Sequence, residues 1–583
     1  MAANRPTPPR PSPPNPANRL FYGDNLDVLR SKIADNSVDL CYIDPPFNSK
    51  RNYFQIYNNQ GSEDRAQAQA FVDTWEWGDE AVAGLDWITD IAQLQSGRLT
   101  EQTVELIRGL EKVLKRGALL AYLVHMTQRI VEIHRVLKPT GSFYLHCDPT
   151  ASHYLKLVLD AVFCGQGGDY INEIIWKRAT AHNDSQQYGR ITDTIFFYGK
   201  SANNHIWNKV YTPYDSAYIE TYFKYDDNDG RGLYWTTDLS APAHGNYYGA
   251  WDGHEPPSGR MWAAPRAYAK RAGIDLPDDW RQALDTLKNL GYIAFGKKGG
   301  RPMLKRYLRH ELGIPLQNLF SDIPSFSGLG RETGYMGYPT QKPEALLERI
   351  LKASSNEGDT VLDAYCGCGT TIAVAQRLNR KWIGIDITYQ SISLILKRLQ
   401  DKYPETWPQI EANIKLDGVP RDIESARALA NRRDDKTRKE FEKWAVLTYS
   451  NNQARINDKK GADGGIDGVA YFLLDKDTNG KAVFQVKSGG ANRATLATLN
   501  SDRQREKAEF GILISMDPPT KAMRNQIQAA GKFKHPLLDR EDDRLQIVTI
   551  DDLLAGAQMD LPMARKDAVK SAKAEGGAQF RLI

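Results

Sequence analysis

Short apolar runs alternate with helical patterns in the first part of the chain. Ser37–Ile43 is a mostly apolar run that stops at Asp44 and two prolines, which predicts a buried parallel strand. Residues 117–137 have helical spacing, Lys138–Gly141 ends that helix, and Ser142–His146 has the pattern of the next strand. This succession predicts a parallel sheet with helices on its faces.

The alternation is lost in the middle of the chain and then returns. Residues 203–335 are rich in tyrosine, tryptophan, glycine and polar turns, which indicates an inserted, loop-rich unit. Strands and helices alternate again from Lys342. We therefore expect residues 18–202 and 336–402 to be the two halves of one α/β domain.

Four other segments differ from this domain in composition. Residues 1–17 are rich in proline, which predicts a disordered arm, and residues 403–435 are charged and weakly periodic, which predicts a linker. Residues 436–556 contain strands and helices of their own, so a second and smaller α/β domain is expected there. Residues 557–583 are rich in lysine and alanine and are expected to be a frayed tail.

Composition narrows the class of protein without deciding its function. The 583 residues are 41% hydrophobic and 25% charged, and the net charge of +4 permits nucleic-acid binding without establishing it. No apolar run is long enough to span a membrane and the start lacks a signal-peptide pattern, so a cytoplasmic location is expected. Among five cysteines, Cys366 and Cys368 lack the second ligand pair of a zinc site.

A glycine-rich turn in the second half is a candidate nucleoside-binding site. A strand that begins at Thr360 (TVLDAY) and carries Asp363 near its end runs into Gly367 and Gly369, which allow a tight turn and close approach to a ligand. About twenty residues on, Asp386 ends the next strand, where a carboxylate can bind ribose hydroxyls. A carboxylate at Asp363 suits the positive end of S-adenosylmethionine better than a pyrophosphate. An ordinary tight turn with a solvent-facing aspartate is the alternative.

The tetrapeptide Asp44-Pro45-Pro46-Phe47 ends the strongest strand of the first half. Asp44 can accept one N–H of an exocyclic amine, and the carbonyl of Pro45, which the prolines hold in place, can accept the other. Phe47 can stack on an extruded base. These groups suit methyl transfer to a base amine, although Asp-Pro is also a common turn starter.

These motifs resemble the β-group of DNA amino-methyltransferases, in which the catalytic motif precedes the cofactor motif. The resemblance covers about residues 18–400. The matching motifs are Gly23-Asp24-Asn25, Ser37-Val38-Asp39-Leu40, Asp44-Pro45-Pro46-Phe47, Leu137-Lys138-Pro139-Thr140-Gly141-Ser142 with His146, Asn172-Glu173-Ile174-Ile175-Trp176, Tyr338-Pro339-Thr340-Gln341-Lys342-Pro343 with Leu346-Leu347, and Asp363 with Gly367, Gly369 and Thr370.

The resemblance implies a Rossmann-like, S-adenosylmethionine-dependent methyltransferase whose insert recognises the DNA target. It implies catalytic roles for the residues of the tetrapeptide and cofactor contacts for Asp24, Lys342, Pro343, Asp363, Tyr365, Gly367, Gly369, Thr370 and Asp386. The family usually has Pro-Phe where Ala364-Tyr365 stand here. A leading Asp in the tetrapeptide accompanies N6-adenine transfer in such enzymes, and a leading Ser accompanies N4-cytosine transfer, which remains the alternative.

The last domain carries a second set of chemical residues. Asp467 is placed to begin a strand, and Gln485 and Lys487 lie on one face of a later strand. This pattern resembles the Mrr-type restriction endonuclease fold and implies Glu442 as the glutamate of the leading helix, with Glu440 as the second candidate. It also implies a Mg²⁺ ion held by Asp467 and Gln485, with Lys487 positioning the attacking water. The alternative is an inactive, nuclease-like domain that only binds DNA.

Taken together, these patterns predict a site-specific DNA adenine methyltransferase fused to a nuclease domain, in restriction-modification or phage defence. Its expected partner is double-stranded DNA, with a homodimer or a defence subunit as further possibilities and no membrane. The sequence has no GxxxxGK[ST] loop, which argues against DNA translocation by this chain. An RNA or small-amine methyltransferase and a DNA-binding module with inactive sites are the competing hypotheses.

Overall fold

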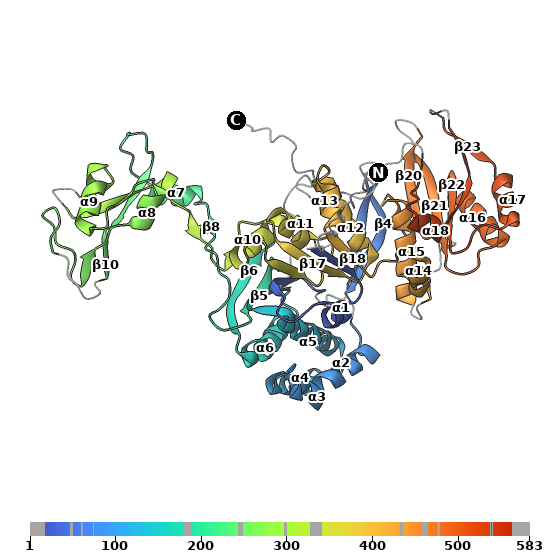
Figure 1. Cartoon of the computed structure of the whole chain (residues 1–583), viewed down its shortest axis with the longest axis horizontal. Helices are drawn as coiled ribbons and strands as arrows, with labels where there is room; N and C mark the ends of the chain where they lie inside the picture. Colours follow the sequence, from blue (N-terminus) through green and yellow to red (C-terminus); the bar gives the residue numbers. More distant parts are fainter. Residues whose placement is uncertain are drawn as a thin grey trace, which may run out of the picture. The chain divides into compact units, whose positions relative to one another are not determined.

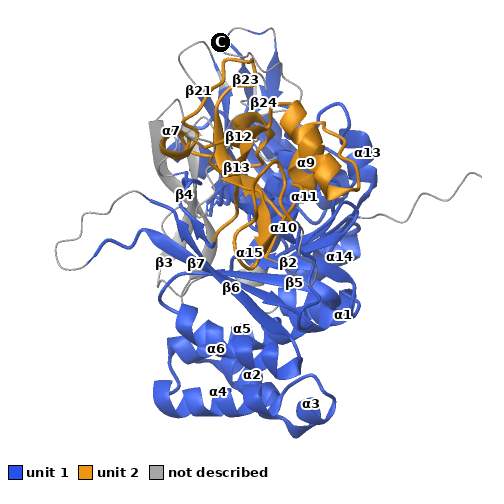
Figure 2. Cartoon of the chain, turned by 90° about the vertical axis from the view of Figure 1, so that its left-hand side faces the viewer, with its two compact units in different colours: residues 1–208, 318–583 blue, residues 209–317 orange. Residues whose placement is uncertain are grey.

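A computed structural model describes residues 18–46, 51–59, 62–73, 75–179, 188–242, 249–296, 300–326, 341–431, 435–451, 453–457, 465–474, 479–536, 538 and 540–561. The chain divides into two compact units (Figures 1 and 2). One comprises residues 209–317 and the other comprises the rest of the chain. Residues 1–17 and 562–583, for which an arm and most of a tail were predicted, lie outside the described residues.

A mixed, nine-stranded sheet is the centre of the larger unit. In spatial order its strands are β15 (Leu319–Phe320), β6 (Asp169–Lys177), β7 (Thr192–Gly199), β5 (Leu137–Cys147), β2 (Val38–Ile43), β16 (Thr360–Asp363), β17 (Lys381–Asp386), β1 (Asn18–Tyr22) and β18 (Ile414–Asp417). The run from β5 to β18 is parallel, and β7 is antiparallel to both β5 and β6. The predicted α/β fold with a parallel central sheet is therefore confirmed.

Helices cover both faces of this sheet because successive strand residues point to opposite sides. On one face Cys41 and Ile43 pack with α1 (Asn25–Lys32), α5 (Ala118–Val136) and α6 (Ser152–Val162). On the other face Leu40 and Tyr42 pack with α10 (Glu344–Ser354), α11 (Thr370–Arg377) and α12 (Tyr389–Lys402). All six residues of β2 are buried, so its end is held from both sides.

A helical layer and a hairpin lie between β2 and α5 in the sequence. Their elements are β3 (Arg51–Asn59), β4 (Ser62–Asp73), α2 (Asp79–Thr89), α3 (Ile91–Gln95) and α4 (Glu101–Leu114). Helix α2 packs against α5, and α4 packs against α5 and α6. A short 3-10 helix, η1 (Cys164–Gln166), follows α6.

The smaller unit has its own aromatic core, which includes Tyr234, Trp251 and Trp262. Its elements are β8 (Tyr211–Thr212), α7 (Ser216–Tyr222), β9 (Tyr234–Asp238), β10 (Ser240–Pro242), β11 (Arg260–Trp262), α8 (Arg266–Arg271), α9 (Trp280–Asn289), β12 (Ile293–Phe295), β13 (Pro302–Tyr307), η2 (Leu308–His310) and β14 (Ile314–Pro315). The unit is shorter than the predicted insert of 203–335, because Leu319 and Phe320 pair with β6 in the central sheet.

Residues 403–435 were predicted to be a linker, and their described part contains two helices and an edge strand of the central sheet. This segment contains α13 (Trp407–Ala412), β18 and α14 (Ile423–Ala430), and β18 extends the central sheet by pairing with β1. An edge strand of four residues has only one buried face and two or three apolar positions. The alternation of apolar and polar residues in β18 is therefore too brief to be recognised within its charged surroundings.

The C-terminal domain begins with α15 (Asp435–Tyr449). It continues through β19 (Arg455–Ile456), β20 (Gly468–Leu473), β21 (Asn479–Lys487), α16 (Arg493–Arg505), β22 (Phe510–Ser515), α17 (Lys521–Ala529), β23 (Lys532–Lys534), β24 (Glu541–Asp543), β25 (Leu545–Thr549) and α18 (Ile550–Leu554). Its main sheet has the order β19-β20-β21-β22-β25. Among the described residues, no helix is both long and apolar enough to cross a membrane.

Candidate active site

The tetrapeptide begins where β2 ends, and its aspartate is paired with a lysine from the other half of the domain. Asp44 Oδ2 accepts a hydrogen bond from Lys342 Nζ. Both side chains are largely buried, at 18% and 10% exposure. The other carboxylate oxygen, Asp44 Oδ1, is buried and has no hydrogen-bond partner among the described residues. Phe47, the predicted stacking residue, lies outside the described residues.

The glycine turn after β16 forms a tight cradle at the start of α11. Gly367 and Gly369 both have positive φ angles, at 48° and 74°. A Cβ on Gly369 would lie 2.6 Å from Ile395 Cγ1, so no other residue fits without displacement. Thr370 Oγ1 donates to the carbonyl of Lys342, which joins this turn to the segment that holds Asp44. Pro343 stands at the N-cap of α10.

Asp386, at the end of β17, organises the neighbouring loop ends. Its Oδ2 accepts the amide N–H of Gly367 at 2.9 Å, and its Oδ1 accepts the N–H and the hydroxyl of Thr388 at 3.0 Å each. Its backbone carbonyl accepts the N–H of Gly23 at the end of β1. Asp386 therefore fixes three strand ends relative to one another, as expected of a residue beside a bound nucleoside.

Asp363 lies at the end of β16, next to β2, and is 4% exposed. Burial raises its pKa to about 7, and the charges of Asp44 and Asp386 add to this rise. Hydrogen bonds from Thr371 and from the N–H of Tyr365 oppose it. Burial likewise raises the pKa of Asp386. Several carboxylates thus share a small buried volume, which favours a cationic ligand.

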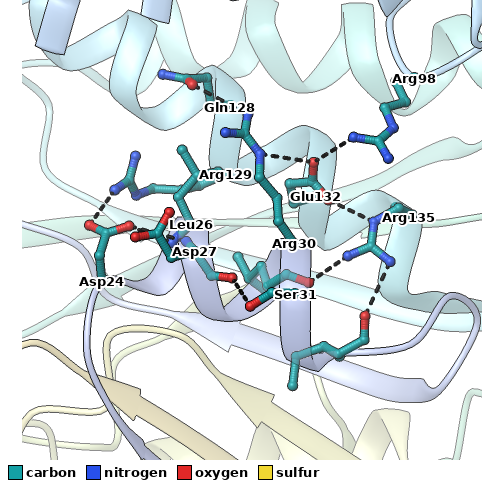
Figure 3. A network of polar contacts seen from close by, with 12 residues as sticks. Asp24, Leu26, Asp27, Arg30, Ser31, Arg98, Gln128, Arg129, Glu132 and Arg135 are labelled. Atoms are coloured by element: carbon teal, nitrogen blue, oxygen red, sulfur yellow. Dashed lines mark hydrogen bonds and ion pairs between the residues drawn. The ribbon is translucent and has the colours of Figure 1, made fainter. Parts of the chain in front are cut away.

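Asp24 caps α1 directly after β1 (Figure 3). Its Oδ1 accepts the N–H groups of Leu26 and Asp27, and its Oδ2 accepts a hydrogen bond from Arg129 on α5 at 2.9 Å. Arg129 also donates to Asn25, whose amide donates to the carbonyl of Ala364 in the glycine turn. The first motif of the chain is thereby tied to the cofactor turn.

A polar network behind Asp44 was not anticipated from the sequence. The Tyr42 hydroxyl and His146 Nδ1 are 2.9 Å apart, and His146 Nε2 lies 3.2 Å from Asp193. Arg178 Nε approaches the other oxygen of Asp193 at 2.9 Å. His146 is fully buried and Asp193 nearly so, so the network stiffens β2 immediately before Asp44. Its residues come from four strands or strand ends, and no local motif could have indicated it.

Three further side chains of the glycine turn, those of Tyr365, Cys366 and Cys368, have defined surroundings. The hydroxyl of Tyr365 is 3.0 Å from His125 Nε2 and donates to Met126 Sδ, so the end of its ring is held by α5. Cys366 and Cys368 are buried free thiols. No cluster of three or more histidine, cysteine or acidic side chains that could hold a metal occurs among the described residues.

A pocket of about 790 Å³ opens beside the ends of β1, β17 and β18. Its lining includes Gly23 and Asp24 from the first motif and Thr388 from the loop that Asp386 holds. Arg129 contributes from α5. Glu440 contributes from α15, the first helix of the C-terminal domain. The pocket wall therefore includes a residue that the sequence analysis assigned to another domain.

The structure brings the four predicted nuclease residues together. Asp467 Oδ2 accepts the N–H of Val486 between Gln485 and Lys487 on β21. Burial raises the pKa of Asp467 to about 7; the charge of Glu442 adds to this rise and that of Lys487 opposes it. Gln485 Nε2 donates to the carbonyl of Gly465, and its Oε1 is buried without a partner among the described residues.

Two family models match the chain. A family described as DNA methylase matches residues 38–397, and a family described as NACHT-associated inactive Restriction Endonuclease 1 matches residues 438–555. The second match supports a restriction-endonuclease-like domain in the expected place. It gives no support to the expected cleavage activity or to Mg²⁺, because the family is described as inactive.

Curated relatives are bacterial DNA methyltransferases. The Type II methyltransferase M.EcaI of Enterobacter cloacae is 29% identical over 48% of this chain and 57% of its own length. The StyLTI Mod subunit, from a Type III restriction-modification enzyme of Salmonella typhimurium, is 27% identical over 63% of this chain and 51% of its own. The DNA adenine methyltransferase YhdJ of Escherichia coli is 24% identical over 66% and 83%. The chain thus spans about half the length of the first two.

Solved structures with similar chains also include DNA methyltransferases. The PvuII DNA methyltransferase, named as cytosine-N4-specific, is 14% identical and covers 69% of this chain and 97% of its own, with a TM-score of 0.29. The M1.HpyAVI-SAM complex is 13% identical over 65% of this chain and 99% of its own, with a TM-score of 0.27.

Proposed function

Because the chain belongs to the DNA methylase family, we propose that it transfers a methyl group from S-adenosylmethionine to the N6 amine of adenine in DNA. The observation that carries this proposal is the state of Asp44. One of its oxygens is bound to Lys342, and the other is buried without a partner among the described residues. A buried, unpartnered acceptor at a strand end is costly unless a ligand donates to it.

The cofactor turn supports the choice of methyl donor. Gly369 permits the tight turn at the start of α11, where a Cβ would clash with Ile395, and Asp386 and Thr388 offer polar groups for a ribose. Asp363 supplies a buried carboxylate between them and Asp44. S-adenosylmethionine carries a positive sulfonium, which suits this acidic surrounding, and it supplies an activated methyl group to a nearby nucleophile. Asp363, Gly367, Gly369 and Asp386 are the residues we propose to hold it.

The residues around the amine would act by orientation and charge. Asp44 Oδ1 would accept one amine hydrogen, so that the nitrogen lone pair points towards the methyl group. Lys342 holds the carboxylate in place through its other oxygen. The amine nitrogen would form a bond to the methyl carbon as the carbon–sulfur bond of the cofactor breaks, which would leave a neutral thioether, and the nitrogen would release one proton to solvent. This balance requires neither a metal ion nor a covalent enzyme intermediate.

Adenine is preferred over cytosine on two grounds. The tetrapeptide begins with Asp, as in the N6-adenine enzymes that the sequence resembles, and one relative is named a DNA adenine methyltransferase.

Residues 209–317 fold as a separate unit inserted between the two halves of the methyltransferase. We propose that this unit, at the place of the predicted insert, reads the DNA target.

Nucleoside mass spectrometry tests this proposal directly. Unmethylated genomic DNA is incubated with the protein and S-adenosylmethionine, without added metal, and then digested to nucleosides. N6-methyladenine is the expected product. N4-methylcytosine would keep the reaction and overturn the choice of base, whereas DNA without any methylated base would contradict the proposed activity.

Cleavage of DNA by the C-terminal domain is a separate proposal that rests on a different observation. Asp467, Gln485 and Lys487 lie together with Glu442 within electrostatic reach, and the unpartnered Oε1 of Gln485 could complete a Mg²⁺ site with Asp467. The description of the matching family as inactive stands against it. Nicking of supercoiled plasmid in Mg²⁺ that disappears in Asp467→Asn would support cleavage, and intact plasmid at every Mg²⁺ concentration would refute it.

A further inference from the structure

Helix α15 opens the restriction-endonuclease-like domain, yet it packs on α12 of the methyltransferase. Phe441, Trp444 and Ala445 are fully or almost fully buried in the same hydrophobic cluster as Ile392 and Ile395 of α12. The hydroxyl of Tyr389 at the start of α12 is 3.1 Å from that of Thr448 on α15. The two helices therefore form a mainly apolar contact between the domains.

Glu440 makes a second polar contact in this interface. Its Oε2 accepts the N–H of Tyr389 at 2.9 Å, and its Oε1 lies 3.1 Å from Lys443 Nζ. The residue is 8% exposed. The N–H of Tyr389 is the first amide of α12, one of the groups that the helix itself cannot satisfy, and a carboxylate there is also favoured by the helix dipole.

The position of Tyr389 in the chain links this contact to the cofactor site. Thr388, the residue before it, caps α12 and donates its hydroxyl and N–H to Asp386. Glu440 thus holds the first turn of α12 immediately next to the loop that Asp386 organises. A shift of that turn would move Thr388 and change the geometry around Asp386.

The order of the strands tells which end of the cofactor lies near Glu440. The methyl group must reach Asp44 on β2, and β16 and then β17 follow β2 in the sheet. A ribose bound at Asp386 on β17 therefore sends the methionine end towards β2 and the base towards β1. The pocket on that side is lined by Gly23, Asp24, Thr388 and Glu440.

We propose that the C-terminal domain completes the nucleoside end of the cofactor pocket through Glu440, a positioning residue for S-adenosylmethionine binding. This inference rests on the proposed cofactor and goes beyond it, because it assigns the second domain a part in methylation that requires neither DNA cleavage nor DNA contact. Glu440 acts by holding the N-terminus of α12, and the hydrogen bond to Tyr389 carries the effect.

Three substitutions in the full-length protein distinguish the effect of the length of the Glu440 side chain from the effect of its charge. Glu440→Gln keeps an oxygen that can accept the N–H of Tyr389, Glu440→Asp keeps the charge on a shorter side chain, and Glu440→Ala removes both. Isothermal titration with S-adenosylmethionine should give a Kd raised about 5- to 10-fold for Ala and for Asp, and within about twofold of the wild type for Gln. At saturating cofactor the methylation kcat should stay within about twofold in all three, because Glu440 is remote from Asp44.

Glu424→Ala is the matched control, because Glu424 is an exposed glutamate on the neighbouring helix α14. Thermal unfolding without cofactor shows whether a variant is folded before it is titrated. A Kd for Glu440→Ala equal to that of the control would overturn the inference, as would an Asp variant that binds normally beside a weakened Gln variant. A wild-type protein without measurable cofactor binding would instead overturn the proposed function.

Discussion

Replacement of Asp44 by asparagine tests the centre of the proposed chemistry with little change in shape. In the native site one carboxylate oxygen faces Lys342 and the other is buried and unpartnered among the described residues. The carboxamide must place its oxygen towards Lys342, since its NH₂ group and the lysine are both donors. Its NH₂ group then occupies the position of Oδ1, where the amine of the target base needs an acceptor.

The size of the effect follows from the groups involved. A hydrogen bond to a charged acceptor contributes about 1.5–3 kcal/mol, and a buried donor left facing another donor costs about 1–3 kcal/mol more. Together these contributions amount to about 2.5–6 kcal/mol, which corresponds to a loss of about 70-fold to more than 10,000-fold in kcat. The Kd for S-adenosylmethionine should change less than about fivefold, because the groups proposed to hold the nucleoside lie on β16 and β17.

Single-turnover transfer of a radiolabelled methyl group to DNA measures the chemical step, and calorimetry measures cofactor binding. Asp39→Asn is the matched control: Asp39 lies on the same strand, is buried and pairs with Lys138 at 2.7 Å. That variant should lose stability but keep its methylation rate per folded molecule. A rate for Asp44→Asn within about tenfold of the wild type would refute the assigned role, and loss of cofactor binding would assign Asp44 to the cofactor instead.

Three other perturbations have defined outcomes. The pKa of Asp363 is about 7 in the folded protein instead of 3.8, so the unliganded protein should lose stability as the pH rises from about 4 to 7. The Kd for S-adenosylmethionine should fall over pH 6–8, because the carboxylate becomes charged, and a Kd independent of pH in titrations would contradict this. Gly369→Ala should lower the free energy of unfolding in urea by about 1–3 kcal/mol and weaken cofactor binding, because its Cβ would contact Ile395. An unchanged urea midpoint would show that the turn adapts. Glu132 is 1% exposed and pairs with three arginines. The substitution Glu132→Gln should lower the free energy of unfolding by about 2–3 kcal/mol and preserve kcat. A decrease below about 0.5 kcal/mol would show that water replaces the ion pairs.

The sequence predicted the parts of the site that are local in the chain. Asp44 after a buried run, and Asp363 before a glycine turn, are recognisable because strand, turn and helix signals adjoin them. Lys342 was expected at the cofactor, whereas its Nζ binds Asp44, since that pairing depends on how two distant segments meet. Glu440 was considered only as an alternative for the nuclease glutamate, because a helix shows two faces and its sequence does not say which neighbour each one meets.

Neighbouring strands of the central sheet come from segments that are far apart in the chain, and this affects both folding and sequence divergence. β2 pairs with β16, so Leu40 lies beside Val361 although more than 300 residues separate them. The edge of β2 that pairs with β16 cannot be covered until the inserted unit and the second half have been synthesised, and an unpaired strand edge is prone to aggregation. The entropic cost of closing the chain between β2 and β16 grows only as the logarithm of its length, by about 0.6 kcal/mol for each doubling. Insertions or exchanges between residues 209 and 317 therefore cost the central sheet little stability. If this unit reads the DNA target as proposed, the sequence that it reads can diverge while the ends of β2 and β16 stay in place.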